Sequence, residues 1–223
     1  EAIDSYQRAI KINPNFTEAY NNLGLAFEDL GKFNEAIDSY QRAIKINPEY
    51  AEAYNNLGVT FKMIGKFNEA IDSYQRAIKI RPDFAEAYNN LGNVYDINEK
   101  VDEAILNYKK AIKINANFTE AYSNLGNLLE EVGKVDEAQI YVNKVLSLTP
   151  NDIGYKINTT LSIIPIINSV DEINFYRNKY KEGLEFLKKY KYLPEKPGDT
   201  IKTNFFHLGY HGRENLELMK NTS

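Results

Sequence analysis

Apolar residues recur along this chain with the spacing of an amphipathic helix, and the spacing occurs twice in every 34 residues. In residues 51–84 the first stretch places four residues at i, i+3, i+4 and i+7: Tyr54, Leu57, Gly58 and Phe61. The second stretch has five residues on one helical face: Ala70, Ile71, Tyr74, Ala77 and Ile78. Each period therefore predicts two helices.

Breaking residues separate the two predicted helices. Gly65 lies between them and suits a helix end that needs a left-handed residue. Pro82 follows the second helix, and because proline lacks an N–H and restricts its predecessor, it predicts that the helix stops there. The unit is predicted to be two antiparallel helices joined by a short turn.

The unit repeats almost unchanged. The segment EAIDSYQRAIKI begins at Glu1, Glu35 and Glu69, and a diverged copy, EAILNYKKAIKI, begins at Glu103, always 34 residues further on. A fixed period of this length predicts a solenoid. We expect a half unit at 1–16, full units at 17–50, 51–84, 85–118 and 119–152, capping helices at 153–192, and an extended segment with a short helix at 193–223.

The repeated pattern is aromatic-x-x-Leu-Gly-x-x-aromatic, then Ala-x-x-x-aromatic, then Pro. In the first full unit these positions are Tyr20, Leu23, Gly24, Phe27, Ala36, Tyr40 and Pro48. The third unit has Ala116 in place of the proline, and the fourth has Val142 in place of an aromatic residue. This pattern resembles the tetratricopeptide repeat. The resemblance implies an all-α solenoid, a right-handed superhelix whose first helices line a concave side.

The small residues of the pattern have a predicted packing role. Gly58 and its counterparts let the two helices of a unit approach closely, while Ala70 and Ala77 do the same toward the next unit. A larger residue would overpack these contacts at a cost of about 1–3 kcal/mol.

The remaining face of the first helices forms columns when the units are aligned. One column is Glu18, Glu52, Glu86 and Glu120; one is Asn21, Asn55, Asn89 and Ser123; one is Asn22, Asn56, Asn90 and Asn124; and one is Leu25, Val59, Asn93 and Asn127. A carboxamide has an acceptor and two donors, so it can pair with both the C=O and the N–H of an extended peptide. We predict peptide binding by all nine asparagines of these columns. The alternative is that they simply face solvent, and for the glutamates we favour a helix-dipole role.

Charge and composition exclude several classes of function. Residues 1–152 carry 16 basic and 23 acidic residues, a net charge of −7, whereas residues 153–223 carry 11 and 8, a net charge of +3. An acidic array without a basic stripe argues against nucleic-acid binding. A clamp for a C-terminal carboxylate would need Lys and Arg in the columns that hold Glu and Asn. No run of about 18 apolar residues exists, so we expect no membrane span.

The absence of cysteine excludes disulfides and favours a reducing compartment, which we take to be the cytoplasm. The chain starts at Glu1, without an initiator Met or a signal peptide, so we expect a piece of a longer protein. We expect no cofactor.

The last 70 residues leave the repeat pattern. An apolar helix with Pro165 is followed by the capping box Ser169–Glu172, a long helix, and the segment TNFFHLGYHG. This order resembles the passage between the repeats and the catalytic domain of bacterial SPINDLY and O-GlcNAc-transferase-like glycosyltransferases. The resemblance implies that His211 lies near the active-site cleft of an intact enzyme whose nucleotide-sugar domain is missing here.

His207 and His211 are the only histidines of the chain. A metal site is disfavoured because Gly209 lies between them and no nearby Cys or paired carboxylate supplies further ligands. A general base is equally disfavoured, since no nucleophile or oxyanion donor is identifiable. We therefore predict that this chain is not itself an enzyme, although the resemblance implies that its parent protein is a glycosyltransferase.

Three functions follow as hypotheses. The first is a polypeptide-binding arm that presents substrates to a glycosyltransferase domain. The second is a scaffold for protein–protein interaction with no enzyme attached. The third is self-association, because residues 1–16 predict a helix whose apolar face is partly exposed, which favours a homodimer through this end.

Overall fold

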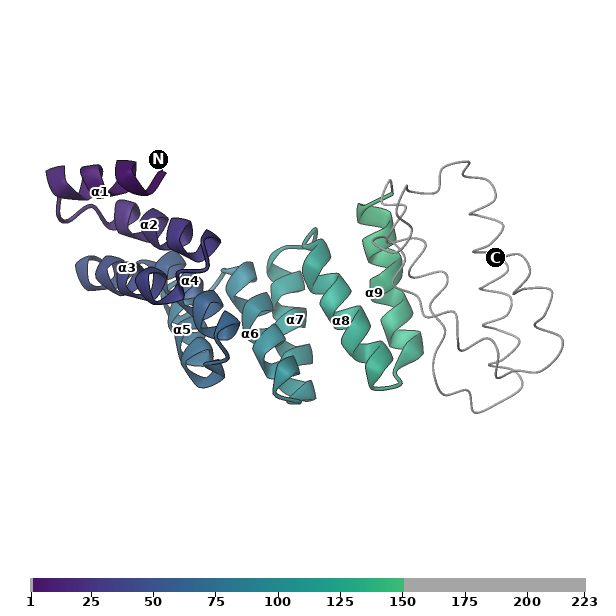
Figure 1. Ribbon diagram of the computed structural model, residues 1–223. Coiled ribbons are helices and arrows are strands. Elements are labelled where there is room, and N and C mark those ends of the chain that lie inside the picture. The colour runs from purple at the N-terminus through teal and green to yellow at the C-terminus, as the bar shows by residue number, and fades with distance from the viewer. Residues whose placement is uncertain (1, 151–223) are drawn as a thin grey trace, which may run out of the picture. The chain divides into compact units, whose positions relative to one another are not determined.

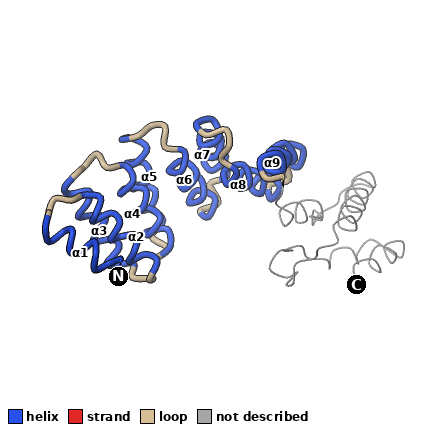
Figure 2. The backbone as a smooth tube through the Cα atoms, turned by 90° about the horizontal axis from the view of Figure 1, so that it is seen from above, coloured by secondary structure: helices blue, strands red, loops and turns tan. Residues whose placement is uncertain are grey.

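A computed structural model describes residues 2–150, and Figure 1 shows the helices up to residue 131 stacked in chain order. Residues 2–150 contain nine α-helices and no strand, which confirms the predicted all-α repeat fold (Figure 2). Residues 1–141 form one compact unit, and a second begins at Val142. The predictions for the capping helices, the extended segment, His207 and His211 concern residues outside the described range.

Each full unit contributes a first and a second helix. The first helices are α2 (Thr17–Asp29), α4 (Ala51–Met63), α6 (Ala85–Ile97) and α8 (Thr119–Glu131). The second helices are α1 (Ala2–Ile12), α3 (Phe33–Ile46), α5 (Phe67–Ile80), α7 (Val101–Ile114) and α9 (Val135–Leu148), of which α1 belongs to the half unit. The most extensive contacts join α2 with α3, α4 with α5, and α6 with α7. Consecutive first helices also contact one another, so α2, α4, α6 and α8 form a continuous row.

The turn between the two helices uses a left-handed residue, as predicted for Gly65. Its φ is +76°, and Gly31 and Gly133 have φ values of +70° and +78° at the equivalent positions. In the third unit the same position is Glu99, which adopts a φ of +57° despite its side chain. The backbone conformation is therefore set by the turn and not by the presence of glycine.

The second helices end two residues before the proline position. α5 ends at Ile80 before Pro82, as predicted. However, α7 ends at Ile114, the equivalent residue, although Ala116 replaces the proline. The Oδ1 of Asn115 accepts a hydrogen bond of 3.1 Å from the N–H of Asn117, and the same local bond forms at Asn13 and Asn47, which precede prolines.

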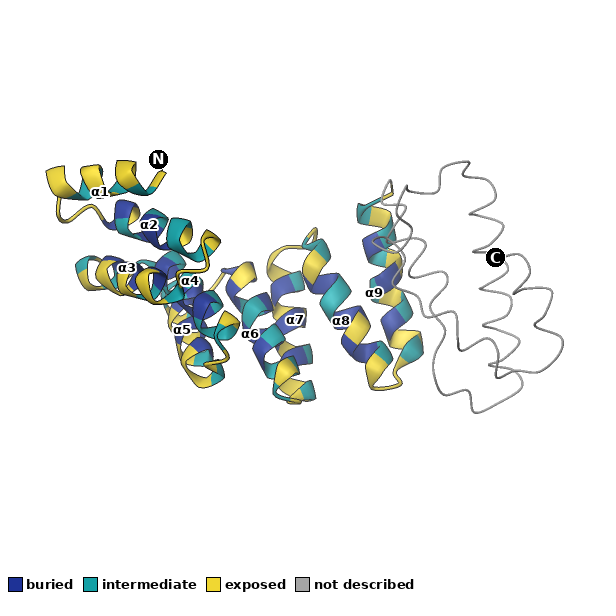
Figure 3. Ribbon diagram, in the orientation of Figure 1, coloured by how far each residue is buried: buried dark blue, intermediate teal, exposed yellow. Residues whose placement is uncertain are grey.

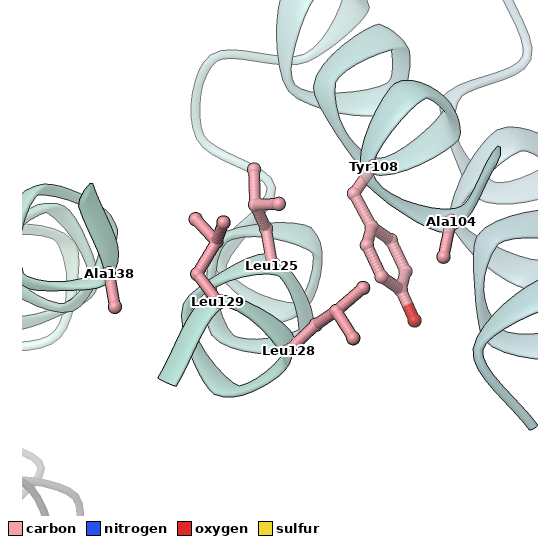
Figure 4. Close-up of a cluster of buried hydrophobic side chains, with 6 residues drawn as sticks. All are labelled: Ala104, Tyr108, Leu125, Leu128, Leu129 and Ala138. Carbon is pink, nitrogen blue, oxygen red and sulfur yellow. The ribbon is translucent and has the colours of Figure 1, made fainter. Parts of the chain in front are cut away.

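The core confirms the packing role of the small residues. A Cβ added at Gly58 would lie 2.7 Å from Cε1 of Tyr74, so glycine is needed where the two helices of a unit meet. Ala70 packs with Leu91 and Val94 of the next unit. Figure 3 shows the resulting buried stripes along the helices, and Figure 4 shows a cluster of the same kind made by Ala104, Tyr108, Leu125, Leu128, Leu129 and Ala138.

Candidate functional site

The candidate site lies on the row of first helices. We use the term first-helix surface for the residues at five positions of each first helix. In α2 these residues are Glu18, Asn21, Asn22, Leu25 and Glu28. The helical spacing brings these positions to one side of each helix. Because consecutive first helices are in contact, equivalent side chains of neighbouring units can interact directly.

The first asparagine column is buried. Asn21, Asn55 and Asn89 are 5 %, 8 % and 1 % exposed, and Ser123 is half-buried. Amides at such positions need hydrogen-bond partners within the protein, since an unpaired buried polar group is costly. The neighbouring units supply these partners.

The second asparagine column donates to the first. Asn56 Nδ2 donates to Asn21 Oδ1 at 3.0 Å. The equivalent bonds from Asn90 to Asn55 and from Asn124 to Asn89 are both 3.1 Å. Each bond runs from one unit to the preceding unit, so the two columns form a single carboxamide ladder. The first column is thus engaged within the protein, which the sequence interpretation did not anticipate.

The second column keeps part of its hydrogen-bonding capacity. Asn56 and Asn90 are half-buried, and each uses one N–H in the ladder, which leaves an Oδ1 and a second N–H unpaired among the described residues. Asn124 uses both donors, because it also bonds Asn93 Oδ1 at 2.9 Å. Asn22 is half-buried, and Asn21 Nδ2 approaches its Oδ1 at 3.5 Å. Peptide binding by the nine asparagines stays a prediction.

One more column consists of Leu25, Val59, Asn93 and Asn127. It determines whether the hydroxyl of a core tyrosine has a hydrogen-bond partner. The Tyr108 hydroxyl donates to Asn93 Oδ1 at 2.8 Å and lies 3.4 Å from Asp96 Oδ2. In the preceding units Leu25 and Val59 replace Asn93, and the hydroxyls of Tyr40 and Tyr74 are buried without a partner. Asn127, in the fourth unit, is exposed. Two members of this column are therefore apolar and two are polar. Of the polar members, Asn93 bonds the core residue Tyr108 and Asn127 lies at the surface.

Glu28 lies in a polar cluster next to these tyrosines. The Thr60 hydroxyl, which is 0 % exposed, donates to the Glu28 carboxylate from the neighbouring first helix. Burial raises the pKa of Glu28, whereas the Thr60 hydrogen bond acts in the opposite direction. Burial and the negative charge of Glu28 together raise the pKa of both Tyr40 and Tyr74.

Two of the four members of the glutamate column have hydrogen-bond partners in the protein. Glu52 Oε1 accepts a hydrogen bond of 2.5 Å from Arg81, whose guanidinium stacks on the Phe84 ring with its Cζ 3.4 Å from the centroid. Glu120 accepts from Asn89 at 3.0 Å, whereas the other two members, Glu18 and Glu86, are exposed near the start of their helices.

The row of first helices is strongly acidic. It carries nine acidic residues and one basic residue: Glu18, Glu28, Asp29, Glu52, Glu86, Asp96, Glu120, Glu130, Glu131 and Lys62. The second helices α1, α3, α5 and α7 carry seven acidic and nine basic residues, so their charge is nearly balanced. The negative charge of the array is therefore concentrated on the first helices.

Two functional features were missed because they depart from the repeat. Thr60 stands where Ala26, Val94 and Leu128 occupy the other first helices, and Arg81 stands where Asn47 and Asn115 precede the proline position. Both exceptions are visible when the units are aligned, so the sequence alone distinguishes Thr60 and Arg81 from their counterparts. Its meaning depends on Glu28 and Glu52, which belong to other helices and cannot be assigned as partners without the structure.

Neither a metal site nor a membrane span is present in residues 2–150. Within this range no group of three or more His, Asp or Glu residues is placed to hold a metal ion. None of the helices described is long and apolar enough to cross a membrane.

Comparison with protein families shows which class of protein this geometry belongs to. A model of the TPR repeat matches residues 1–31, 29–65, 63–96 and 97–133, and a model of the tetratricopeptide repeat matches residues 119–152. The chain belongs to the tetratricopeptide repeat family. A search among curated proteins found no match.

Solved structures identify particular relatives. A crystal structure of MamA is 38 % identical, with a TM-score of 0.60, over 66 % of this chain and 86 % of that chain. A second MamA structure is 37 % identical, with a TM-score of 0.58, over 69 % of this chain and 84 % of that chain. YrrB, described as a TPR protein with an unusual peptide-binding site, is 22 % identical, with a TM-score of 0.61, over 82 % of this chain and 90 % of that chain. At that identity, YrrB shares the fold.

Proposed function

We propose that the first-helix surface binds an extended segment of a partner polypeptide and that the chain acts as a protein-binding scaffold. The observation that carries this proposal is the second asparagine column. Asn56 and Asn90 sit in the middle of the row, half-buried, each with an Oδ1 and an N–H that the ladder does not use.

The chemistry of the proposed contact is main-chain recognition. An amide oxygen and an amide N–H held side by side pair with the N–H and C=O of a peptide bond, independently of the peptide's side chains. The ladder fixes both side chains before the peptide arrives, so less rotamer freedom is lost on binding. Side-chain preference must then come from other positions of the surface.

A selection from a displayed library of random peptides tests this proposal. The selected peptides should bind the wild-type chain, and both Asn56→Ala and Asn90→Ala should weaken them by about tenfold, the effect of a lost buried hydrogen bond. Gln41→Ala, an exposed change on α3, is the matched control and should leave binding unchanged. Failure to select any peptide, or equal binding by all four proteins, would remove the proposal.

A glycosyltransferase attachment remains a separate prediction. It depends on residues 153–223, and the family models match residues 1–152 only, so they add no support for it. The test is the gene sequence beyond Ser223. A continuing frame that encodes a nucleotide-sugar domain would support the prediction, and a stop codon would leave the scaffold. A cytoplasmic location also stays a prediction.

Self-association is the second candidate function, and it rests on α1. Tyr6 is half-buried, whereas its counterparts Tyr40, Tyr74 and Tyr108 are at most 1 % exposed. We propose that a second copy covers this face of α1. Sedimentation should then show a concentration-dependent dimer that Tyr6→Lys abolishes, and a monomer at high concentration would contradict it.

A further inference from the structure

Glu28 is the one acidic residue of the first-helix surface whose carboxylate accepts a hydrogen bond from a fully buried threonine hydroxyl. Thr60 donates to its carboxylate, and neither Tyr40 nor Tyr74 has a partner for its hydroxyl. Both tyrosines are 0 % exposed. A buried hydroxyl without a partner is costly, so the two tyrosine hydroxyls leave this polar part of the core incompletely paired.

The repeat geometry directs the Tyr40 hydroxyl toward this carboxylate, whereas the equivalent position for Tyr74 is Lys62. The equivalent hydroxyl of Tyr108 reaches Asn93 and Asp96, and Asp96 is the counterpart of Glu28. Burial, and after it the charge of Glu28, raise the pKa of Tyr40 and of Tyr74. The hydroxyl that donates to the carboxylate and favours its ionised form is that of Thr60.

No cation of the described residues pairs with this carboxylate. Lys62 is close enough to favour the ionised form of Glu28, but this effect is smaller than that of burial, and Asp29 opposes it. A half-buried carboxylate without an ion-pair partner, within a row of nine acidic residues and one basic residue, is a site for a positive charge from outside the chain.

We infer that Glu28 binds the ammonium group of a lysine side chain on the partner polypeptide, with Thr60 as the positioning residue behind the carboxylate; this inference rests on the proposed function. An ammonium suits the site better than a guanidinium. Arginine prefers both oxygens of a carboxylate, and Thr60 already bonds one of them. Lysine is a compact charge that needs a single free oxygen.

Fluorescence anisotropy with two labelled peptides tests the inference. The first is (Gly-Ser-Lys)5, and the second is the same peptide with every lysine acetylated, which removes the charge and keeps the length. The wild-type chain should bind the lysine peptide at least about tenfold more tightly than the acetylated peptide. The preference should weaken as salt rises and screens the charges.

Three variants separate Glu28 from the general negative charge. Glu28→Gln should weaken the lysine peptide by about tenfold, whereas Glu35→Gln, the same charge change at an exposed position of α3, should change it by less than about twofold. Thr60→Val removes the hydroxyl that bonds the Glu28 carboxylate and keeps the side-chain shape, which Val94 already has at the equivalent position, so it should weaken the lysine peptide. A purely structural threonine would show no effect on binding.

The outcomes distinguish this inference from the proposed function. Equal losses in Glu28→Gln and Glu35→Gln would overturn the lysine site, because the attraction would then be diffuse. Library peptides that contain no lysine, bind through Asn56 and Asn90, and are unaffected by Glu28→Gln would also overturn it while the proposed function stands. If neither the library nor the lysine peptide yields binding, both fail.

Discussion

The side-chain amide of Asn124 donates a hydrogen bond of 3.1 Å to the Oδ1 of Asn89, 35 residues earlier in the chain. The same bond is repeated one and two units before it. Because the spacing equals one unit plus one residue, the repeat itself generates a bond across every interface between first helices. Each interface is thus held by apolar packing and by a carboxamide pair, and each unit is coupled to its immediate neighbours.

Replacing Asn89 should therefore cost stability. Asn89 is 1 % exposed, accepts from Asn124 and donates to Glu120. Asn89→Ala removes both bonds and leaves the half-buried Asn124 amide without one of its acceptors, whereas the exposed Glu120 can bond water, so we expect a loss of about 1–3 kcal/mol in the free energy of unfolding. Urea denaturation followed by circular dichroism measures it. Asn127→Ala, at an exposed position, should stay within about 0.5 kcal/mol of wild type, and equal effects of the two changes would contradict the ladder.

Gly58→Ala should destabilise the chain although alanine is the better helix former. The added Cβ would lie 2.7 Å from Cε1 and 2.8 Å from Cδ1 of Tyr74, a ring that is 0 % exposed and cannot move away. We expect the overpacking to cost about 1–3 kcal/mol beyond the roughly 1 kcal/mol that alanine gains by helix propensity.

Gly31→Ala separates this steric effect from backbone strain. No atom lies within 4 Å of a Cβ added at Gly31, but its φ is +70°. Its cost should be limited to about 1 kcal/mol for a left-handed alanine. Urea denaturation of both variants compares them, and a Gly58→Ala chain with normal stability would show that the helices of a unit separate easily.

The repeat makes much of this fold predictable from sequence. Helix positions, the Gly65 turn and the contacts of Ala70 depend on residues within one unit or the next, and the pattern repeats them until they are unambiguous. The left-handed Glu99 and the end of α7 before Ala116 show that backbone geometry persists where the signal residue is absent. Neighbouring copies therefore predict these positions better than their own residues do.

The candidate site was less predictable because its chemistry lies between units. The asparagine columns are visible in the sequence, but a column does not tell which amide bonds which. The structure pairs Asn56 with Asn21, and so separates a buried column from one with atoms left for a ligand. Thr60 and Glu28 are 32 residues apart, and their hydrogen bond depends on the offset between α4 and α2, which no single unit encodes.

Ala116→Pro should stabilise the chain. Asn115 has φ −124° and ψ 97°, close to the −125° and 95° of Asn47, which precedes a proline. No backbone hydrogen bond from the N–H of residue 116 is present among the described residues, so proline removes no bond. The loss of freedom in the unfolded chain should raise the free energy of unfolding by about 0.4–1 kcal/mol. Thermal melting measures it, and a lower melting temperature would mean that the third unit differs in backbone from the first.

Glu28→Gln should stabilise the chain at neutral pH and lose that advantage in acid. Burial raises the pKa of Glu28, so in the pH range above the ordinary glutamate pKa the folded chain holds more protons than the unfolded chain. Stability therefore falls as pH rises through this range, and the contribution is fully present only below the ordinary pKa. Glutamine carries no charge to desolvate, and its amide oxygen can still accept from Thr60.

Denaturation of the Glu28→Gln chain at two pH values tests this. At about pH 7 it should be more stable than wild type, and at about pH 4 the two should be equal. Asp29, Lys62, Tyr40 and Tyr74 are present in both proteins, so their own titration cancels in the difference. Glu35→Gln should show little change at either pH, since Glu35 is exposed. A Glu28→Gln chain that is less stable at neutral pH would mean that Thr60 and Lys62 already compensate the buried charge. The half-buried carboxylate has no ion-pair partner among the described residues, and its charge costs stability in the folded chain. A positively charged ligand would offset that cost on binding.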